Sequence, residues 1–583
     1  MVLILAVHGG LLGFGAWQHT PSVDETGHLA AGLSHWEFGV FDLYRVNPPL
    51  VRLVAALPVY FGDFKRDWGN WDPQRFSRSE FPVGRQLISA NRERSRNMYF
   101  QARCCVIPFS VLGAFSCFLW GRALWGTEAG LVALTLWAFS PMIMGHGQMI
   151  TPDVPAAATG SIALYAFRSW LLDMSLRKAI AAGAFMGIAL ATKGTWVILF
   201  LLYPGIWVGW RIFRSRIRPG PRWSAQLLQI CVMMSLGLHV LNCCYGYAGS
   251  FKHLSSYQFL STSLSGLPPS GGQECGNRFR STVLGQLPVP FPSDYIQGID
   301  WQRFEFEDAQ PAYMHGQLFE SGRWYYYMYA LLVKMPIGFL AVFALGIACL
   351  IGDLRKRRLS SDIAFTVLIP FICLFVLVSS QTGINKHLRY ALPAFPFIFV
   401  IASRAVGAVD PGAWHRAFVA VCLVCSVSAS LSVYPHSMSF FNAAVGGPLN
   451  GPRHLLNSNV GWGQDLYYLC DWIDAHEVRG DRYLAVHANY APSDVGVVVE
   501  PFPSCCCRDS NRRPGDNAAV IPPKGWYFLD VSLLYGYPYR AVSDSGGSDY
   551  VCPEIMAWFR RQTPVDRIGF SLYVYRVPPA AVQ

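Results

Sequence analysis

The chain has 583 residues, of which 52% are hydrophobic and only 14% carry a charge. Soluble domains usually contain about 25% charged residues, so this depletion predicts a polytopic membrane protein. The formal net charge of +11 does not indicate binding of nucleic acid. The basic residues gather in short loops between apolar segments, where they set the orientation of a membrane protein.

Eleven apolar segments approach the roughly 20 residues that a helix needs to cross a bilayer. The first of them lacks the basic region and cleavage site of a signal peptide, so we interpret it as a retained helix. The sequence therefore predicts a polytopic α-helical membrane protein with about eleven transmembrane helices. The segments cover residues 2–18, 102–121, 129–147, 154–172, 179–192, 195–212, 226–247, 325–351, 362–380, 390–406 and 415–434.

Basic residues in the short loops predict which side of the membrane each loop faces. If a break at Lys193 separates 179–192 from 195–212, the basic loops all reach one side, which the positive-inside rule identifies as the cytoplasm. Those loops contain Arg122, Arg177-Lys178, the Arg residues of 211–222, residues 355–358 and Arg404. The opposite face then carries the long segments 19–101 and 248–324, the turns 148–153 and 381–389, and the tail from about 435. Within 19–101, residues 50–62 are apolar but too short to span, which predicts an interfacial helix.

The chain changes character after the last apolar segment. Alternating or β-branched and aromatic runs predict strands at 482–487, 525–531 and 567–576, and a helix near 463–476. We therefore expect a transmembrane domain over 1–436 and a small extracytoplasmic α/β domain over 437–583. One or two disulfides are expected in such a tail, although their pairing stays open. The tail cysteines are Cys470, Cys505, Cys506, Cys507 and Cys552.

Two groups of acidic residues lie on the predicted outer face. Asp24-Glu25 follows the first apolar segment, and Asp153 directly precedes another. Adjacent acids at a membrane are costly unless they meet a cation, a base or a reacting substrate. Acids from separate loops could bind a divalent cation or share acid–base roles. The alternative is that Asp24 and Asp153 simply begin helices.

Basic residues also occur on this outer face, where short loops should contain few of them. Lys193 lies at the predicted break, and Lys386, His387 and Arg389 lie in one turn. Arg holds a phosphate through forked hydrogen bonds, and Lys provides a point charge. These residues could therefore bind a lipid-linked phosphate or diphosphate. Contacts with lipid headgroups are the alternative.

Taken in order, these motifs resemble the GT-C superfamily of integral-membrane glycosyltransferases. The most similar groups are the protein O-mannosyltransferases (family 39) and the transferase that adds aminoarabinose to lipid A. The resemblance covers roughly residues 10–480. It is carried by Asp24-Glu25, Asn47-Pro48-Pro49-Leu50, Thr151-Pro152-Asp153, Ala191-Thr192-Lys193-Gly194, Lys386-His387-Leu388-Arg389-Tyr390 and the tail segment Ser458–Leu466, in which an acid often replaces Gly461 in bacterial members.

The resemblance implies transfer of a sugar from a polyprenyl-phosphate carrier to a hydroxyl acceptor at the extracytoplasmic face of a membrane. In a bacterium this would be the inner (plasma) membrane. Asp24 would be the general base. Glu25 and Asp153 would bind a divalent metal ion (Mg²⁺, Mn²⁺ or Zn²⁺) or orient the substrates. The donor phosphate would be held by Lys193, Lys386, His387 and Arg389. The partners are the lipid-linked sugar, membrane lipids and a protein, lipid or glycan acceptor; the sugar stays open.

Three other functions fit the sequence less well. A lipid-linked oligosaccharide ligase or polymerase also uses Arg and His at the outer face, but the early acidic pair argues against it. A transporter or flippase would have two similar halves and charges near the middle of its helices, and the sequence shows neither. A non-catalytic relative is disfavoured because the acids and the basic turn occur together.

Overall fold

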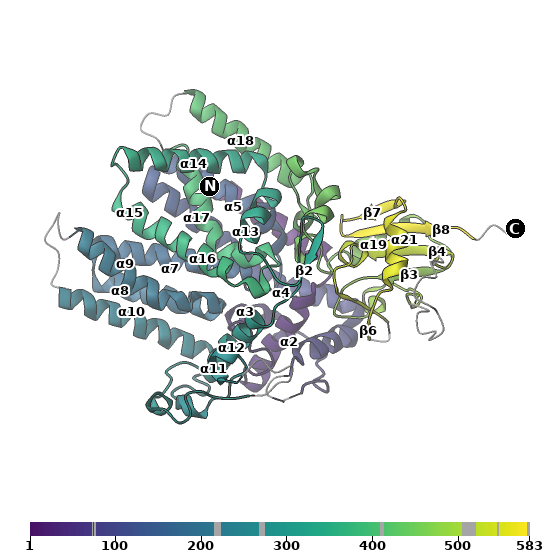
Figure 1. Ribbon diagram of the computed structural model, residues 1–583, viewed down its shortest axis with the longest axis horizontal. Helices are drawn as coiled ribbons and strands as arrows, with labels where there is room; N and C mark the ends of the chain where they lie inside the picture. Colours follow the sequence, from purple (N-terminus) through teal and green to yellow (C-terminus); the bar gives the residue numbers. More distant parts are fainter. Residues whose placement is uncertain are drawn as a thin grey trace.

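The computed structural model describes residues 1–72, 74, 77–214, 223–267, 275–407, 413–503, 521–544 and 547–579. The molecule has a helical part and, next to it, a smaller part that contains most of the strands and ends at the C-terminus (Figure 1). The helices of the first half are α1 (Val2–Gln18), α2 (Val23–Phe38), α3 (Leu50–Phe61), α4 (Glu80–Trp125), α5 (Thr127–Ala138), α6 (Pro141–His146), α7 (Asp153–Asp173), α8 (Leu176–Thr192), α9 (Leu199–Arg214), α10 (Trp223–Cys244), α11 (Thr262–Ser265) and α12 (Ser293–Glu307).

The helices that follow the second long loop complete the helical part. Two short strands, β1 (Ala312–Met314) and β2 (Gln317–Phe319), form an antiparallel pair at the end of that loop. The next helices are α13 (Tyr326–Lys334), α14 (Ile337–Arg355), α15 (Ser361–Ile363), α16 (Ile369–Ser380), α17 (Phe395–Ser403) and α18 (Ala413–Leu431). The 3₁₀ segments η1 (Gly194–Ile198) and η6 (Leu388–Ala394) precede α9 and α17.

All eleven apolar segments are largely helical, but the predicted number of spans is not confirmed. Among the described residues, six helices are long and apolar enough to cross a membrane, or seven if the bent pair α1 and α2 is one span. Two predicted spans are divided before Pro141 and Pro336, because proline provides no backbone N–H and disfavours helix at the residue before it. The break at Lys193 is confirmed, since this residue has an extended backbone between α8 and η1.

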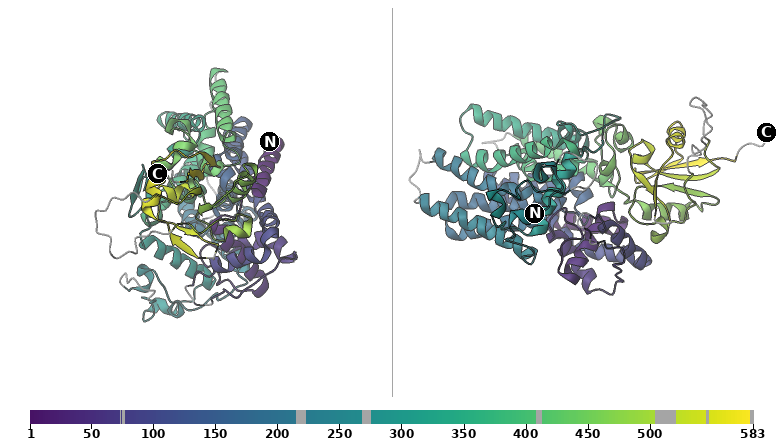
Figure 2. Two further views of the ribbon diagram at one scale, coloured as in Figure 1. Left: turned by 90° about the vertical axis from the view of Figure 1, so that its right-hand side faces the viewer. Right: turned by 60° about the horizontal axis from the view of Figure 1, so that its bottom comes forward.

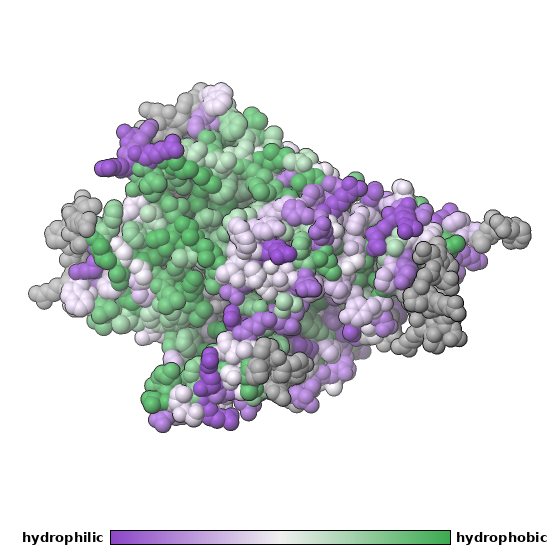
Figure 3. Space-filling view, viewed as in Figure 1, coloured by the Kyte–Doolittle hydropathy of each residue, from purple (hydrophilic) through white to green (hydrophobic). Residues whose placement is uncertain are grey.

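Apolar side chains gather on the surface of the helical part. In Figure 3 they cover the side formed by the long helices, whereas hydrophilic side chains cover the part with the strands. Exposed large apolar residues occur on several of the candidate spans, including Leu228 on α10, Ile351 on α14, Val376 on α16 and Val421 on α18. Such a surface is suited to contact with lipid.

The tail contains a four-stranded mixed sheet in the order β3-β4-β8-β7. β3 is parallel to β4, and the other two pairings are antiparallel. The strands are β3 (Arg482–Ala485), β4 (Gly525–Asp530), β7 (Asp566–Ile568) and β8 (Leu572–Val577), with a separate pair β5 (Arg540–Val542) and β6 (Ser548–Tyr550). The helices are α19 (Leu466–Ala475), α20 (Val531–Leu534) and α21 (Pro553–Arg560).

The predicted elements of the tail are present, with one correction. The segment 567–576, predicted as one strand, is the β7–β8 hairpin, because Gly569 and Phe570 both have positive φ angles and turn the chain. Cys552 is disulfide-bonded, whereas Cys470 has a free thiol. Cys505, Cys506 and Cys507 lie outside the described residues.

The tail packs against the first helices, as two further views show (Figure 2). Leu466 and Leu469 of α19 and Phe528 of β4 share one apolar cluster with Leu29 of α2 and Tyr99 of α4. Burial of such side chains is the main favourable term in folding and contributes about 1.5–3 kcal/mol for each large residue. This packing holds the loop between α18 and α19 against the beginning of α2.

Candidate active site

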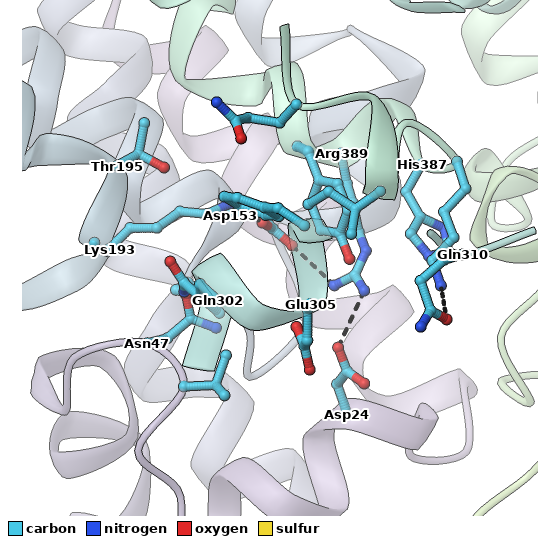
Figure 4. Close-up of a pocket in the computed structure, with 18 of the residues that line it drawn as sticks. Asp24, Asn47, Asp153, Lys193, Thr195, Gln302, Glu305, Gln310, His387 and Arg389 are labelled. Atoms are coloured by element: carbon cyan, nitrogen blue, oxygen red, sulfur yellow. Dashed lines mark hydrogen bonds and ion pairs between the residues drawn. The ribbon is translucent and has the colours of Figure 1, made fainter. Parts of the chain in front are cut away.

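A cavity of about 510 Å³ lies where the N-terminal ends of α2 and α7 meet the turn before α17 (Figure 4). A volume of this size can hold a small-molecule substrate. One part of its wall is apolar and includes Val197, Ile299, Leu377, Val378 and Ile384. The charged residues that line it are Asp24, Arg78, Asp153, Lys193, Arg303, Glu305, Lys386 and Arg389.

Arg389 joins two of the predicted site residues. Its Nη2 donates to Asp24 Oδ2 at 3.1 Å, and its Nη1 donates to Asp153 Oδ2 at 3.2 Å. Asp24 belongs to the first turn of α2, which begins after the N-cap Ser22, so Asp24 is not the cap. Asp153 is the first residue of α7. The turn before α17 thus brings together two helix N-termini that are far apart in sequence.

Asp153 also binds Lys193, the residue at the break between α8 and η1. Lys193 Nζ donates to Asp153 Oδ1 at 2.5 Å, and the Asp153 side chain is only 2% exposed. Burial alone would raise the pKa of Asp153, but the positive charges of Lys193 and Arg389 outweigh it and lower this pKa to about 2. Asp153 is therefore ionised at neutral pH, and each of its oxygens accepts from a cation.

The tail provides an aromatic support for Arg389. The guanidinium carbon lies 3.9 Å from the centre of the Trp462 ring, close enough for a cation–π interaction. Trp462 lies within Ser458–Leu466, one of the segments on which the predicted family resemblance rests, and it lines the cavity. His487 and Tyr539, also from the tail, line the cavity as well.

The neighbouring turn residues Lys386 and His387 line the same cavity. Burial lowers the pKa of Lys386, and its Nζ donates to Gln310 Oε1 at 3.3 Å. Burial, together with the charges of Arg389 and Lys386, lowers the pKa of His387 well below its usual value. The Nδ1 of His387 lies 2.7 Å from the Ser458 hydroxyl. The imidazole is therefore neutral at pH 7 and can exchange a hydrogen bond but cannot contribute a full charge.

Glu25 is the one predicted site residue that the structure does not bring to the cavity wall. It is fully buried and forms an ion pair with Arg103 at 2.6 Å. Its carboxylate also accepts from the backbone N–H groups of Ser22 and Ile150. Asp24 and Glu25 are adjacent in a helix and therefore point in different directions, so Asp24 alone faces the cavity.

The predicted metal ligands do not fit a shared metal ion. Glu25 is bound by Arg103, and Asp153 is bound by both Lys193 and Arg389. Each carboxylate is thus neutralised by protein cations, which would repel a divalent ion at the same position. Glu25 and Asp153 therefore do not offer a shared site to a metal ion.

Several cavity residues come from segments in which the sequence pattern marked no site. Glu305 and Gln302 belong to α12 in the second long loop, and Arg78 belongs to the first. Arg78 Nη1 donates to Glu305 Oε1 at 3.0 Å. Charged residues on an amphipathic helix usually face solvent, so only the three-dimensional packing distinguishes Glu305 from its neighbours.

Part of the chain is similar to a described family of glycosyltransferases. Residues 91–234 match the family described as dolichyl-phosphate-mannose-protein mannosyltransferase. The predicted resemblance to the GT-C superfamily is thereby confirmed over that segment. No curated protein sequence matches the chain.

Solved structures show a distant similarity. ArnT from Cupriavidus metallidurans is 14% identical, with 98% of this chain and 97% of that chain covered, at TM-scores of 0.44 for the apo state and 0.46 for the state bound to undecaprenyl phosphate. Archaeal oligosaccharyltransferase AglB from Archaeoglobus fulgidus, in complex with an inhibitory peptide and a dolichol-phosphate, is 11% identical at a TM-score of 0.41. That comparison covers 74% of this chain and 55% of that chain.

Proposed function

We propose that this protein is a membrane glycosyltransferase that moves a sugar from a polyprenyl-phosphate carrier to a hydroxyl acceptor at the extracytoplasmic face. The main observation is that Arg389 links Asp24 and Asp153 in a cavity that has both a cationic and an apolar wall. A lipid-linked donor needs both, because its phosphate is anionic and its carrier is a hydrocarbon. The description of the matched family, which names dolichyl-phosphate-mannose, supports the same class of donor.

In this proposal the basic residues hold the donor phosphate. Arg389, Lys193 and Lys386 all line the cavity. When the bond between the sugar and the phosphate breaks, negative charge develops on the leaving phosphate, and fixed cations stabilise it. The neutral His387 offers a hydrogen bond beside them. The apolar residues Leu377 and Val378 of α16 would contact the first part of the carrier chain.

Asp24 is the general base of this proposal. Its side chain is 22% exposed, in contrast to 2% for Asp153, so an acceptor hydroxyl can approach it. A base takes the proton of that hydroxyl as its oxygen attacks the anomeric carbon, and the phosphate leaves with the bonding electrons. Asp153 is held between Lys193 and Arg389 with a pKa of about 2 and is almost fully buried, so we assign it to orienting those two cations.

Both proposed domains, 1–436 and 437–583, contribute to this site. The helical part provides the acids and cations, and the tail provides Trp462, His487 and Tyr539. Glu25 is assigned to positioning rather than catalysis, because its carboxylate is bound by Arg103 and by backbone N–H groups. A bacterial inner membrane, with the cavity on its outer side, is the proposed location.

The proposal is tested by sugar transfer from a panel of donors in membranes that contain the protein. The panel contains polyprenyl-phosphate mannose, aminoarabinose and galacturonic acid, and one diphosphate-linked oligosaccharide. Release of the free lipid phosphate, or of the free lipid diphosphate from the diphosphate-linked donor, is measured for the wild type, for Asp24→Asn and for a control. The control is Asp63→Asn, which changes a fully exposed acid outside the cavity.

We expect one monophosphate donor to be consumed by the wild type and by the control. Loss of a general base lowers the rate by about 10²–10⁴-fold. The rate of donor consumption by Asp24→Asn should therefore be at least about 10²-fold lower than that of the wild type. Consumption of only the diphosphate donor would instead indicate a ligase or polymerase. Equal rates for Asp24→Asn and the wild type would refute the role of Asp24.

A further inference from the structure

A second cluster of ligand-type side chains lies outside the cavity, where three distant segments meet. His19 lies between α1 and α2, His436 lies between α18 and α19, and Asp465 is the N-cap of α19. One ligand atom from each lies within 4.8 Å of the other two. Asp465 Oδ1 is 3.7 Å from His19 Nε2 and 3.2 Å from His436 Nδ1. These residues do not line the cavity described above.

The contact with the Gly15 carbonyl favours a tautomer of His19 whose Nε2 lone pair faces Asp465. His19 Nδ1 lies 3.0 Å from the carbonyl oxygen of Gly15, which can only accept, and 3.2 Å from Gln148 Nε2, so the contact with Gly15 is a hydrogen bond when the proton is on Nδ1. In a neutral imidazole, Nε2 then has a lone pair. That lone pair faces a carboxylate oxygen in a region where the two side chains are 2% and 0% exposed. Two buried acceptors that face each other are unfavourable unless a proton or a metal cation lies between them.

Two groups bind the Oδ2 atom of Asp465, whereas Oδ1 lies within hydrogen-bond distance of His436 Nδ1. Gln464 Nε2 donates to Asp465 Oδ2 at 2.9 Å, and the Ser571 hydroxyl donates to the same oxygen. Metal-binding histidines and carboxylates are typically fixed in this way, through hydrogen bonds on the atom that does not bind the metal. His19 Nε2 and Asp465 Oδ1 therefore face each other across a distance of 3.7 Å.

Gly569 provides the space beside this point. It lies in the β7–β8 turn with a φ of +59°. A Cβ atom at this position would lie 2.6 Å from His436 Nδ1 and 2.8 Å from the Asp465 carboxylate. Any side chain at this position would therefore clash with the His436 ring and the Asp465 carboxylate. Glycine leaves the space in which these two groups approach each other.

We propose that His19, His436 and Asp465 form a binding site for a divalent cation of the zinc class. Zinc bonds of about 2.0–2.1 Å at tetrahedral angles place two ligand atoms roughly 3.4 Å apart, close to the 3.2 Å and 3.7 Å separations here. Two imidazoles and one carboxylate favour Zn²⁺ over Mg²⁺ or Ca²⁺, which prefer oxygen ligands. The fourth ligand is water in this proposal.

The cation would tie the tail to the junction of α1 and α2. His19 precedes Asp24 by only five residues. Thr20, the neighbour of His19, donates its backbone N–H to the carbonyl oxygen of Gln464 at 2.9 Å. A metal ion bound to His19, His436 and Asp465 would fix the same three segments more strongly. Its role is therefore structural, and it acts at a distance from the acceptor and donor.

The test uses the full-length protein, purified in detergent and stripped with a chelator. Zn²⁺ alone is added, excess metal is removed by dialysis, and bound zinc is measured by mass spectrometry. The variants are His436→Gln and Asp465→Asn. The matched control is His476→Gln, because His476 is exposed and its Nδ1 contacts only the carbonyl of Trp472. Folding without metal is checked by gel filtration and thermal unfolding.

We expect the wild type and His476→Gln to retain one more zinc ion per chain than His436→Gln and Asp465→Asn. Zinc should also raise the Tm of the wild type but not that of His436→Gln. Equal zinc retention by folded His436→Gln and the wild type would overturn the proposal. In a parallel experiment the stripped protein is loaded with Co²⁺ in place of Zn²⁺. An absorption spectrum that contains only a thiolate charge-transfer band would also overturn the proposal, because it would place the metal on cysteines.

Discussion

Glu25 and Arg103 form a two-point ion pair inside the protein. Arg103 Nε donates to Glu25 Oε1 at 2.8 Å, and Nη2 donates to Oε2 at 2.6 Å. The other hydrogen bonds of the guanidinium go to the backbone oxygens of Ala16, His19 and Thr20. The pair therefore fixes the chain between α1 and α2, and this junction sets the position of Asp24.

Replacing Glu25 by glutamine should destabilise the protein rather than remove a reacting group. Loss of one member of a buried ion pair leaves the other charge uncompensated and costs about 3–5 kcal/mol. We expect Glu25→Gln to lower the free energy of unfolding in detergent by about this amount. The control Glu477→Gln, whose side chain is 80% exposed, should unfold like the wild type. Unchanged stability with complete loss of transfer would instead give Glu25 the metal-binding or substrate-orienting role that the family resemblance implies.

The order of motifs along the chain predicted most of the candidate site. Asp24, Asp153, Lys193, Lys386, His387 and Arg389 all line one cavity, because each follows or precedes an apolar segment on the same predicted side. The sequence did not separate Asp24 from Glu25. Their different roles depend on the direction of each side chain on α2 and on the position of Arg103, which is 78 residues away from Glu25.

The limits of the sequence analysis have physical causes. Hydropathy marks apolar helices but does not measure where a helix is broken, so Pro336 divides a segment that appears continuous. Glu305 reaches the cavity only because α12 packs against the turn at 382–384, a contact between distant segments. Trp462 was part of a recognised motif, yet its role under Arg389 depends on how the tail docks.

Substitution of Arg389 by lysine should impair transfer although the charge is kept. One ammonium cannot reproduce the fork that reaches Asp24 and Asp153 at 3.1 Å and 3.2 Å, nor the planar stacking on Trp462. A hydrogen bond between charged groups contributes about 1.5–3 kcal/mol, so we expect kcat/KM for the donor to fall by roughly 10–100-fold. The measurement is the initial rate at several donor concentrations.

Arg323→Lys is the matched control for this experiment. Arg323 is exposed, lies over the Phe319 ring and does not line the cavity. It should retain the wild-type rate. A wild-type kcat/KM for Arg389→Lys would show that the fork is not needed, and the proposed binding of the donor phosphate would then fail.

The ion pairs of Asp153 predict how the stability of the protein depends on pH. Its pKa is lowered from 3.8 to about 2, so the native state binds fewer protons than the unfolded state between these values. The contribution of ionised Asp153 to the free energy of unfolding is fully present above about pH 4 and is lost as the pH falls towards 2. A shift of this size corresponds to about 2 kcal/mol.

Unfolding of wild type and Asp153→Asn in detergent between pH 5 and 2 measures this contribution. The stability of the wild type should fall more steeply, because the variant has no carboxyl group to protonate at this position. Asp471→Asn, a substitution on the exposed side of α19, should follow the wild type. Parallel curves for the wild type and Asp153→Asn would contradict the low pKa of Asp153.

The orientation of the cavity can be measured with single cysteines at the two ends of one candidate span. Ser361–Ser380 has 20 residues, or about 30 Å of helix, and Arg357 and Gln381 lie just beyond its opposite ends. Gln381 also lines the cavity. In intact cells, a membrane-impermeant thiol reagent should label Gln381→Cys above the wild-type background and should leave Arg357→Cys at that background. Both cysteines should react once the membrane is opened. Labelling of Arg357→Cys alone in intact cells would place the cavity on the cytoplasmic side and would rule out transfer at the outer face.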